Sequence, residues 1–153
     1  MRIGEICTRT VVTCGRTASA LELAQLMRNH HVGDVIVVDA VEGGSTPVGI
    51  VTDRDLVVLV MAKGVDPELL SAGDMMTDEL VTAPESEDVY DAIWHMRSQG
   101  VRRLPIVDAK SHLCGVLTSD DVTEFLAAEM VEMARIMPRQ IRLEETEREP
   151  VTR

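Results

Sequence analysis

The sequence has few aromatic residues, few cysteines and no long apolar run. Only 2% of its 153 residues are aromatic, so the core must be aliphatic and few side chains can stack on nucleobases. Its three cysteines form no CxxC pair, and they imply no disulfide framework. Because no apolar run reaches the length of a membrane span and none follows the N-terminus, we expect neither a transmembrane helix nor a signal peptide, and we predict a cytoplasmic protein.

The excess of acidic residues narrows the range of partners further. The formal net charge is −11 at pH 7, which repels phosphate backbones and anionic lipids at long range. We therefore expect no nucleic acid and no membrane among the partners. A single small anion is still compatible with this charge, because a pair of arginines or a helix N-terminus acts at short range.

An internal repeat with an offset of about 69 residues organises most of the chain. Residues 6–8 (Ile-Cys-Thr) match residues 75–77 (Met-Met-Thr), and residues 49–52 (Gly-Ile-Val-Thr) match residues 115–118 (Gly-Val-Leu-Thr). The offset shortens between these two matches because the first copy carries extra residues in the Gly-rich loop 41–46. Loop tips tolerate such insertions, so both copies are expected to form the same structure.

Each copy has the pattern of a short strand, a helix, two strands and a second helix. In the first copy, apolar residues at helical spacing predict a helix over 17–30, two β-branched runs predict strands at 35–38 and 48–51, and a helix over 53–63 follows. One such sheet is too small to be stable alone. We therefore predict an α/β (α+β) fold, in which two pseudo-twofold-related β-α-β-β-α units pack sheet to sheet with a cleft for each copy at their interface.

The predicted units are residues 1–66 and 73–137, joined by a linker at 67–72. The last helix of the second unit extends beyond the repeat, and we expect it to end at Pro138 because proline cannot continue a helix. Residues 138–153 alternate Arg and Glu, which predicts a solvated, charged tail that is partly helical or disordered.

Each copy joins a strand to a helix with the motif Gly-x-x-Thr-x-x-Asp, which ends in Thr52 and Asp55 in the first copy and in Thr118 and Asp121 in the second. One interpretation is a capping box, although that box prefers Glu or Gln to Asp. The other is a ligand site, in which the carboxylate accepts hydrogen bonds from ribose hydroxyls and the helix N-terminus attracts a phosphate. The glycine would let something approach the strand closely. The two interpretations are compatible, because one threonine can serve in both.

A tandem of such units, each with this motif, resembles a pair of CBS domains, the Bateman module, over roughly residues 1–130. The stretches 51–57 and 101–108 are also typical of that family, and the chain resembles the short bacterial proteins that consist of a CBS pair and little else. The resemblance implies an adenine nucleotide (AMP, ADP or ATP) or a relative such as S-adenosylmethionine or NAD, bound in a cleft between the repeats. The residues implied for it are Asp55 and Asp121 at the ribose, Thr52 and Thr118 at ribose or phosphate, the backbone near Val12, Val81 and Ala83 at the adenine, and Arg102 and Arg103 at the phosphate.

The two copies differ at the residues implied for phosphate. Arg102-Arg103 in the second copy correspond to Gly33-Asp34 in the first. An aspartate near a phosphate repels it, so one cleft is expected to bind anions more weakly. The sequence leaves open which cleft each arginine serves. We predict one competent site, which uses Thr118 and Asp121.

Other residues that suggest chemistry have simpler explanations. We find no set of nucleophile, base and orienting group, no P-loop and no zinc signature, so we predict neither catalysis nor a metal site. His30 and His31 stand at a predicted helix end, where histidine caps carbonyls. Trp94 is expected to pack against the rest of the chain rather than to serve as a stacking platform.

The last helix of each unit predicts a homodimer. Residues 56–61 are apolar on all sides, and the helix of the second unit continues through Met130, Met133 and Met137. A chain of this size can hardly bury these faces alone, so helices from two copies are expected to pack together. We therefore expect a regulatory sensor whose change of dimer geometry is read by an unidentified effector protein. The alternatives are a ligand-free dimerisation or scaffold protein, and a redox or metal-binding stress protein that uses Cys and His.

Overall fold

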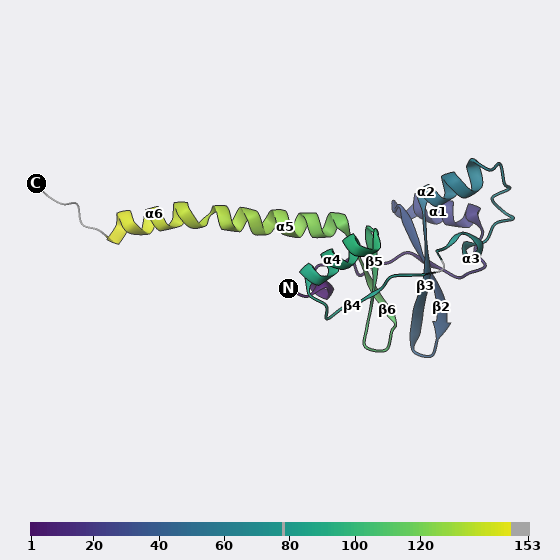
Figure 1. Cartoon of the computed structure of the whole chain (residues 1–153), viewed down its shortest axis with the longest axis horizontal. Helices are drawn as coiled ribbons and strands as arrows, with labels where there is room; N and C mark the ends of the chain where they lie inside the picture. Colours follow the sequence, from purple (N-terminus) through teal and green to yellow (C-terminus); the bar gives the residue numbers. More distant parts are fainter. Residues whose placement is uncertain (78, 148–153) are drawn as a thin grey trace, which may run out of the picture.

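The computed structural model describes residues 1–77 and 79–147, and its first unit contains a three-stranded sheet (Figure 1). β1 (Thr13–Cys14) runs parallel to β2 (Asp34–Val41), and β2 pairs antiparallel with β3 (Gly44–Thr52). The β-branched run at the start of β2 is buried, because one face of the sheet is covered by a helix and the other by the second unit.

The second unit repeats this sheet with β4 (Ala83–Pro84), β5 (Arg103–Val107) and β6 (Leu113–Thr118) in the same order and directions. β3 and β6 of the two sheets lie in contact. The predicted fold class, two related α/β units packed sheet to sheet, is therefore confirmed.

A capped helix covers each sheet. α1 (Ala20–His30) begins at a capping box, in which the Ser19 N–H donates to Oε2 of Glu22 at 2.8 Å and the Ser19 side chain accepts from the Glu22 N–H. It ends at His31, whose φ of 55° is left-handed and whose N–H donates to a carbonyl of the last turn. α4 (Val89–Gln99) has the equivalent place in the second unit. The observed helices match the predicted periodicity, with α1 starting later than expected because its cap is Ser19.

The segment that begins each copy packs on the sheet of the other copy. η1 (Ile3–Glu5) buries Ile3 in the core of the second sheet, and Thr8 exchanges two backbone hydrogen bonds of 2.9 Å with Val116 on β6. α3 (Ala72–Met75) is buried in the core of the first sheet. The two units are therefore interleaved, and each core is completed by residues that precede the other copy's sheet.

The apolar segment after the first motif forms an irregular helix. α2 (Asp53–Asp55) is followed by the π-helix η2 (Leu56–Met61), in which the Ala62 N–H donates to the carbonyl of Val57 at 2.8 Å. Val60 is buried against the first core, whereas Val57 and Met61 are exposed. Within one chain, this helix thus buries one face and leaves another in solvent.

The prediction that Pro138 ends the last helix is wrong. α5 (Ser119–Ala134) is followed after one residue by α6 (Ile136–Glu147), and Pro138 lies in the first turn of α6. A proline costs no hydrogen bond there, because the first N–H groups of a helix have no intrahelical partner. The start of the predicted tail is therefore helical, and α5 and α6 together project from the second unit (Figure 1). Within the described residues, no helix has the length and apolar character that crossing a membrane requires.

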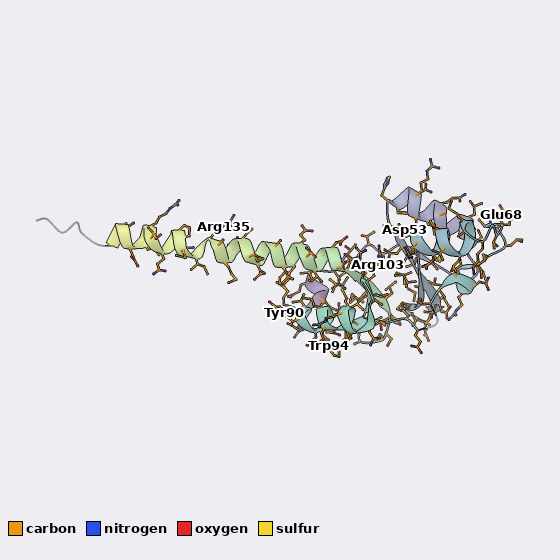
Figure 2. All side chains as sticks on the ribbon, turned by 45° about the horizontal axis from the view of Figure 1, so that its top comes forward. Asp53, Glu68, Tyr90, Trp94, Arg103 and Arg135 are labelled. Atoms are coloured by element: carbon orange, nitrogen blue, oxygen red, sulfur yellow. The ribbon has the colours of Figure 1, made fainter. Side chains whose placement is uncertain are left out.

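The prediction that Trp94 packs within the chain is also wrong. Its side chain is 62% exposed on α4, and Tyr90, one turn earlier, is exposed as well (Figure 2). The buried residues of both cores are aliphatic or Met, as the composition predicts. Phe125 of α5 packs at the edge of the second core. Trp94 fits neither core because α4 buries the face that carries Val89 and Met96.

Candidate functional site

A pocket of about 190 Å³ lies where the two units meet. It is bounded by the N-terminal segment that reaches across to β6, by the turn between α1 and β2, and by the adjoining ends of β5 and β6, where Arg103 pairs with Thr118. Both copies therefore contribute to one site. The lining residues are Thr8, Thr10, Val11, Val12, Val32, Gly33, Asp34, Arg102, Arg103, Val116, Thr118, Ser119 and Asp120.

An ion pair between the two copies lies in this pocket. Nε of Arg103 is 2.5 Å from Oδ1 of Asp34, and the two side chains are 31% and 15% exposed. Figure 2 shows Arg103 where the units meet, near Asp53. Gly33 leaves room for the side chains of Arg103 and Asp53. A Cβ at this position would lie 3.3 Å from Nη2 of Arg103 and 3.4 Å from Oδ2 of Asp53. Burial raises the pKa of Asp34 above its ordinary value and Asp53 raises it further, while Arg103 opposes the shift.

The second predicted arginine also faces a carboxylate. Nη2 of Arg102 lies 4.0 Å from Oδ1 of Asp120, and both side chains are largely exposed. The pocket therefore combines two cations with two anions rather than presenting a bare cationic surface. A strongly negative ligand has to compete with Asp34 for Arg103, whereas a neutral or zwitterionic ligand finds partners of both signs.

Both Thr-x-x-Asp motifs form capping boxes. Oγ1 of Thr118 donates to Oδ2 of Asp121 at 2.7 Å and accepts from the Asp121 N–H at 3.1 Å, and the same Oδ2 accepts from the Thr118 N–H at 2.8 Å. Thr52 and Asp55 make the equivalent contacts at 2.7, 3.3 and 2.7 Å. The capping interpretation is thus confirmed in both copies. Aspartate, which is shorter than the usual Glu or Gln, can complete the capping box here because the threonine hydroxyl donates to it as well as the backbone N–H.

Four of the residues predicted to contact ligand line the pocket: Val12, Arg102, Arg103 and Thr118. Asp121 does not line this pocket: Thr118 holds its carboxylate, and the residue lines a separate hollow with Ile6 and Phe125. The other predicted residues lie elsewhere, with Val81 and Ala83 in or against the second core and Thr52 and Asp55 in the capping box of the first unit. Their roles toward a ligand stay predictions.

The sequence did not identify Thr8, Thr10 and Asp120 as pocket residues. For Asp34 it predicted only that the carboxylate would weaken anion binding in one of the two clefts. The repeat contained the relevant signal. Asp34 and Arg103 are equivalent positions of the two copies. Equivalent residues near a pseudo-twofold axis face each other across it. The two copies have diverged there into a pair of opposite charges.

The glycine of each motif makes room for the chain itself. A Cβ on Gly115 would lie 2.7 Å from Sγ of Cys7, and one on Gly49 would overlap Sδ of Met76. Cys7 and Met76 are equivalent in the repeat, and each belongs to the segment that packs on the other copy's sheet. The predicted close approach to the strand is therefore confirmed, but the group that approaches is a side chain of this protein and not a ligand.

Partial burial disfavours the thiolate form of all three cysteines. It raises the pKa of Cys7 and Cys114, and it raises that of Cys14 to about 11, with Glu22 contributing. We expect iodoacetamide at about pH 8 to alkylate Cys14 about a hundredfold more slowly in the native protein than in the denatured protein, because the thiolate is the reactive species. Mass spectrometry of timed samples measures this ratio. Equal rates for native and denatured Cys14 would contradict its half-buried position against the first core.

Comparison with known proteins assigns the chain to a family. A family model described as the CBS domain matches residues 3–62 and 72–128. An uncharacterized protein of Methanopyrus kandleri is 38% identical over 122 residues, which is 80% of this chain and 61% of that protein. The uncharacterized protein YlbB of Bacillus subtilis is 34% identical over 122 residues, 80% of each chain. Hypoxic response protein 1 of Mycobacterium tuberculosis is 29% identical over 117 residues, 75% of this chain and 78% of that one. The chain belongs to the CBS domain family.

Solved structures agree with this assignment. The CBS domain pair of protein MJ0100, in complex with 5′-methylthioadenosine and S-adenosyl-L-methionine, has a TM-score of 0.73 at 24% identity and covers 84% of this chain and 98% of its own. A CBS-domain containing protein of Agrobacterium tumefaciens has a TM-score of 0.69 at 28% identity, covering 81% and 98%. The predicted resemblance is confirmed: the chain is a CBS pair, which is a regulatory module.

Proposed function

We propose that this CBS pair senses an adenosyl compound of low net charge, bound in the pocket between its two units. The observation that carries the proposal is the charge balance of that pocket, in which Arg103 faces Asp34 and Arg102 faces Asp120. The structural relative MJ0100 offers a parallel, because both of its ligands are adenosyl compounds without a phosphate.

Each part of such a ligand has a partner in the pocket. Val12 and Val32 supply an apolar surface for the adenine, and the hydroxyls of Thr118 and Ser119 lie where a ribose can hydrogen-bond. At the other end, the amino-acid group of S-adenosylmethionine would set its carboxylate against Arg103 and its ammonium against Asp34. The single phosphate of AMP would find the arginines but not a partner for Asp34.

Ligand binding would be transmitted through the contact between the copies. The Arg103–Asp34 pair joins the two units directly, so a ligand that separates these side chains changes how the units hold each other. In our proposal the protein is a cytoplasmic homodimer, it is not an enzyme, and an effector protein reads the change. No step requires a metal.

A ligand-free scaffold is the second candidate, and one observation favours it. Asp34 already balances the charge of Arg103, so the pocket needs no anionic occupant to neutralise this arginine. On this alternative the two units serve only to hold a dimer together. The two candidates differ in whether any adenosyl compound stabilises the folded protein.

A thermal-shift panel with 5′-methylthioadenosine, S-adenosylmethionine, AMP and ATP distinguishes them. A ligand present at 100 times its Kd stabilises the folded state by about 2.7 kcal/mol. We expect a shift with the first three compounds and the smallest shift with ATP, because its charge opposes that of Asp34. The variant Thr10→Trp, which fills the pocket from an exposed position, is the control and should not respond. If none of the compounds shifts the wild type at millimolar concentration, the scaffold is the correct candidate.

A further inference from the structure

Beyond its first turns, the helix formed by α5 and α6 packs against no other part of the chain that the structure describes. It projects from the second unit (Figure 1), and every residue from 127 to 144 is exposed. Arg135, between the two helices, lies far from both sheets (Figure 2). Most of the stability of a helix in a protein comes from packing of an apolar face, so an apolar face on this helix would be expected to pack on another surface.

An apolar stripe runs along this helix. Met130, Met133, Met137 and Ile141 recur at helical spacing, and the first three are 70%, 69% and 70% exposed. The stripe starts beside Leu126, which packs against the second core. Exposed apolar residues in a continuous row mark a contact with another macromolecule.

Four of these apolar positions are placed symmetrically along the helix. Measured from the point between Met133 and Ala134, Leu126 is as far in one direction as Ile141 is in the other, and Met130 is as far as Met137. A twofold axis through that point brings each position of one helix against its counterpart in an antiparallel copy. The pattern therefore fits a second copy of the same helix.

The charges on the helix favour the same arrangement. On the N-terminal side of the central point all charged residues are acidic, and on the other side, as far as residue 143, all are arginines. Antiparallel pairing about this point brings Glu132 level with Arg135 of the other copy and Glu129 within one residue of Arg139, whereas parallel pairing sets like charges side by side. The charged residues in question are Asp120, Asp121, Glu124, Glu129, Glu132, Arg135, Arg139 and Arg142.

We propose that two copies of this chain associate through α5 and α6, with the helices antiparallel and the twofold axis between Met133 and Ala134. This inference rests on the homodimer in the proposed function and adds its surface, direction and register. It accounts for the adaptable methionines, which pack well against their own kind across an axis. The two CBS pairs then lie at opposite ends of the paired helices.

The first test is the oligomeric state of the full chain by light scattering. The wild type should be a dimer, and Met130→Glu with Met137→Glu should raise the dimer dissociation constant about tenfold or more, because two carboxylates per chain would be desolvated. Leu69→Glu, at a residue 78% exposed and outside this helix, is the matched control and should leave the dimer unchanged. A monomeric wild type would overturn both the homodimer and its register.

Cross-linking decides the direction. Met130→Cys and Met137→Cys carry distinguishable tags and are expressed both singly and together, with the wild type giving the background from its three native cysteines. An antiparallel pair forms a disulfide between the two variants but little within either variant alone, while Met133→Cys links to itself. A dimer in which Met130→Cys links to itself and not to Met137→Cys would refute the antiparallel register and leave the homodimer standing.

Discussion

Asp34→Asn is expected to raise the affinity of the protein for AMP about tenfold, equivalent to about 1.4 kcal/mol. In the wild type, the carboxylate of Asp34 holds Arg103 at 2.5 Å and repels a phosphate brought to the same place. Asparagine has the same shape without the charge, so Arg103 becomes available to the ligand. The same change should weaken S-adenosylmethionine, whose ammonium group loses its partner. Calorimetric titration of both ligands measures this change of preference.

Two controls make this result specific. Asp91→Asn removes one negative charge from an exposed position outside the pocket lining, and it should change neither affinity.

The pH dependence is the second control. Because burial raises the pKa of Asp34, this carboxylate is protonated at a higher pH than an exposed aspartate. Protonation frees Arg103, so lowering the pH should increase AMP affinity more in the wild type than in Asp34→Asn. Equal AMP affinity for wild type and Asp34→Asn would mean that the Arg103–Asp34 ion pair does not control the affinity for the ligand.

Gly115→Ala is expected to destabilise the folded protein by about 1–3 kcal/mol, although the substitution adds a single methyl group. Its Cβ would lie 2.7 Å from Sγ of Cys7 and 3.2 Å from the carbonyl oxygen of Thr8. Both atoms belong to the N-terminal segment, which packs on β6 and then lines the pocket. Displacing this segment should therefore reduce ligand affinity together with stability. Urea unfolding of the purified protein measures the free energy.

The interleaving of the two units can be tested by rescue. Cys7→Ala removes the atom at 2.7 Å, so the double variant Gly115→Ala with Cys7→Ala should recover most of the lost stability. At the equivalent position, Gly49→Ala should not be rescued by Met76→Ala, because the Cβ of Met76 stays at 2.7 Å. Additive effects of Gly115→Ala and Cys7→Ala would show that the N-terminal segment does not lie on the second sheet.

Local pattern was enough to predict most of the fold. The repeat, the helix of each copy and the two hairpin strands follow from apolar spacing, because each element buries one face against its own unit. The interleaving does not follow from spacing, since a short segment such as residues 3–8 carries no periodicity that says which sheet it will cover. The wrong prediction at Pro138 has a related reason. Whether a proline ends a helix or lies in the first turn of the next one depends on where the preceding helix ends, and the spacing does not show this.

The candidate site could be predicted only in part. The arginines and Thr118 are recognisable because their residue types suit an anionic or hydroxylated ligand. The pairing of Arg103 with Asp34 depends on the pseudo-twofold axis, which brings equivalent positions of two distant segments together. Trp94 shows a further limit of prediction from sequence. A large apolar side chain on a helix is expected to be buried, and only the structure shows that Trp94 lies on the exposed face of α4.

The most direct test of a ligand site between the units is calorimetric titration of the wild type and of Thr10→Trp with S-adenosylmethionine, 5′-methylthioadenosine and AMP. We predict saturable binding of at least one of these compounds by the wild type, with one ligand per pocket. We predict its loss in Thr10→Trp, because the indole would occupy the pocket from an exposed lining position. Binding that persists unchanged in Thr10→Trp, or no binding of any of the three at millimolar concentration, would contradict a ligand site in this pocket.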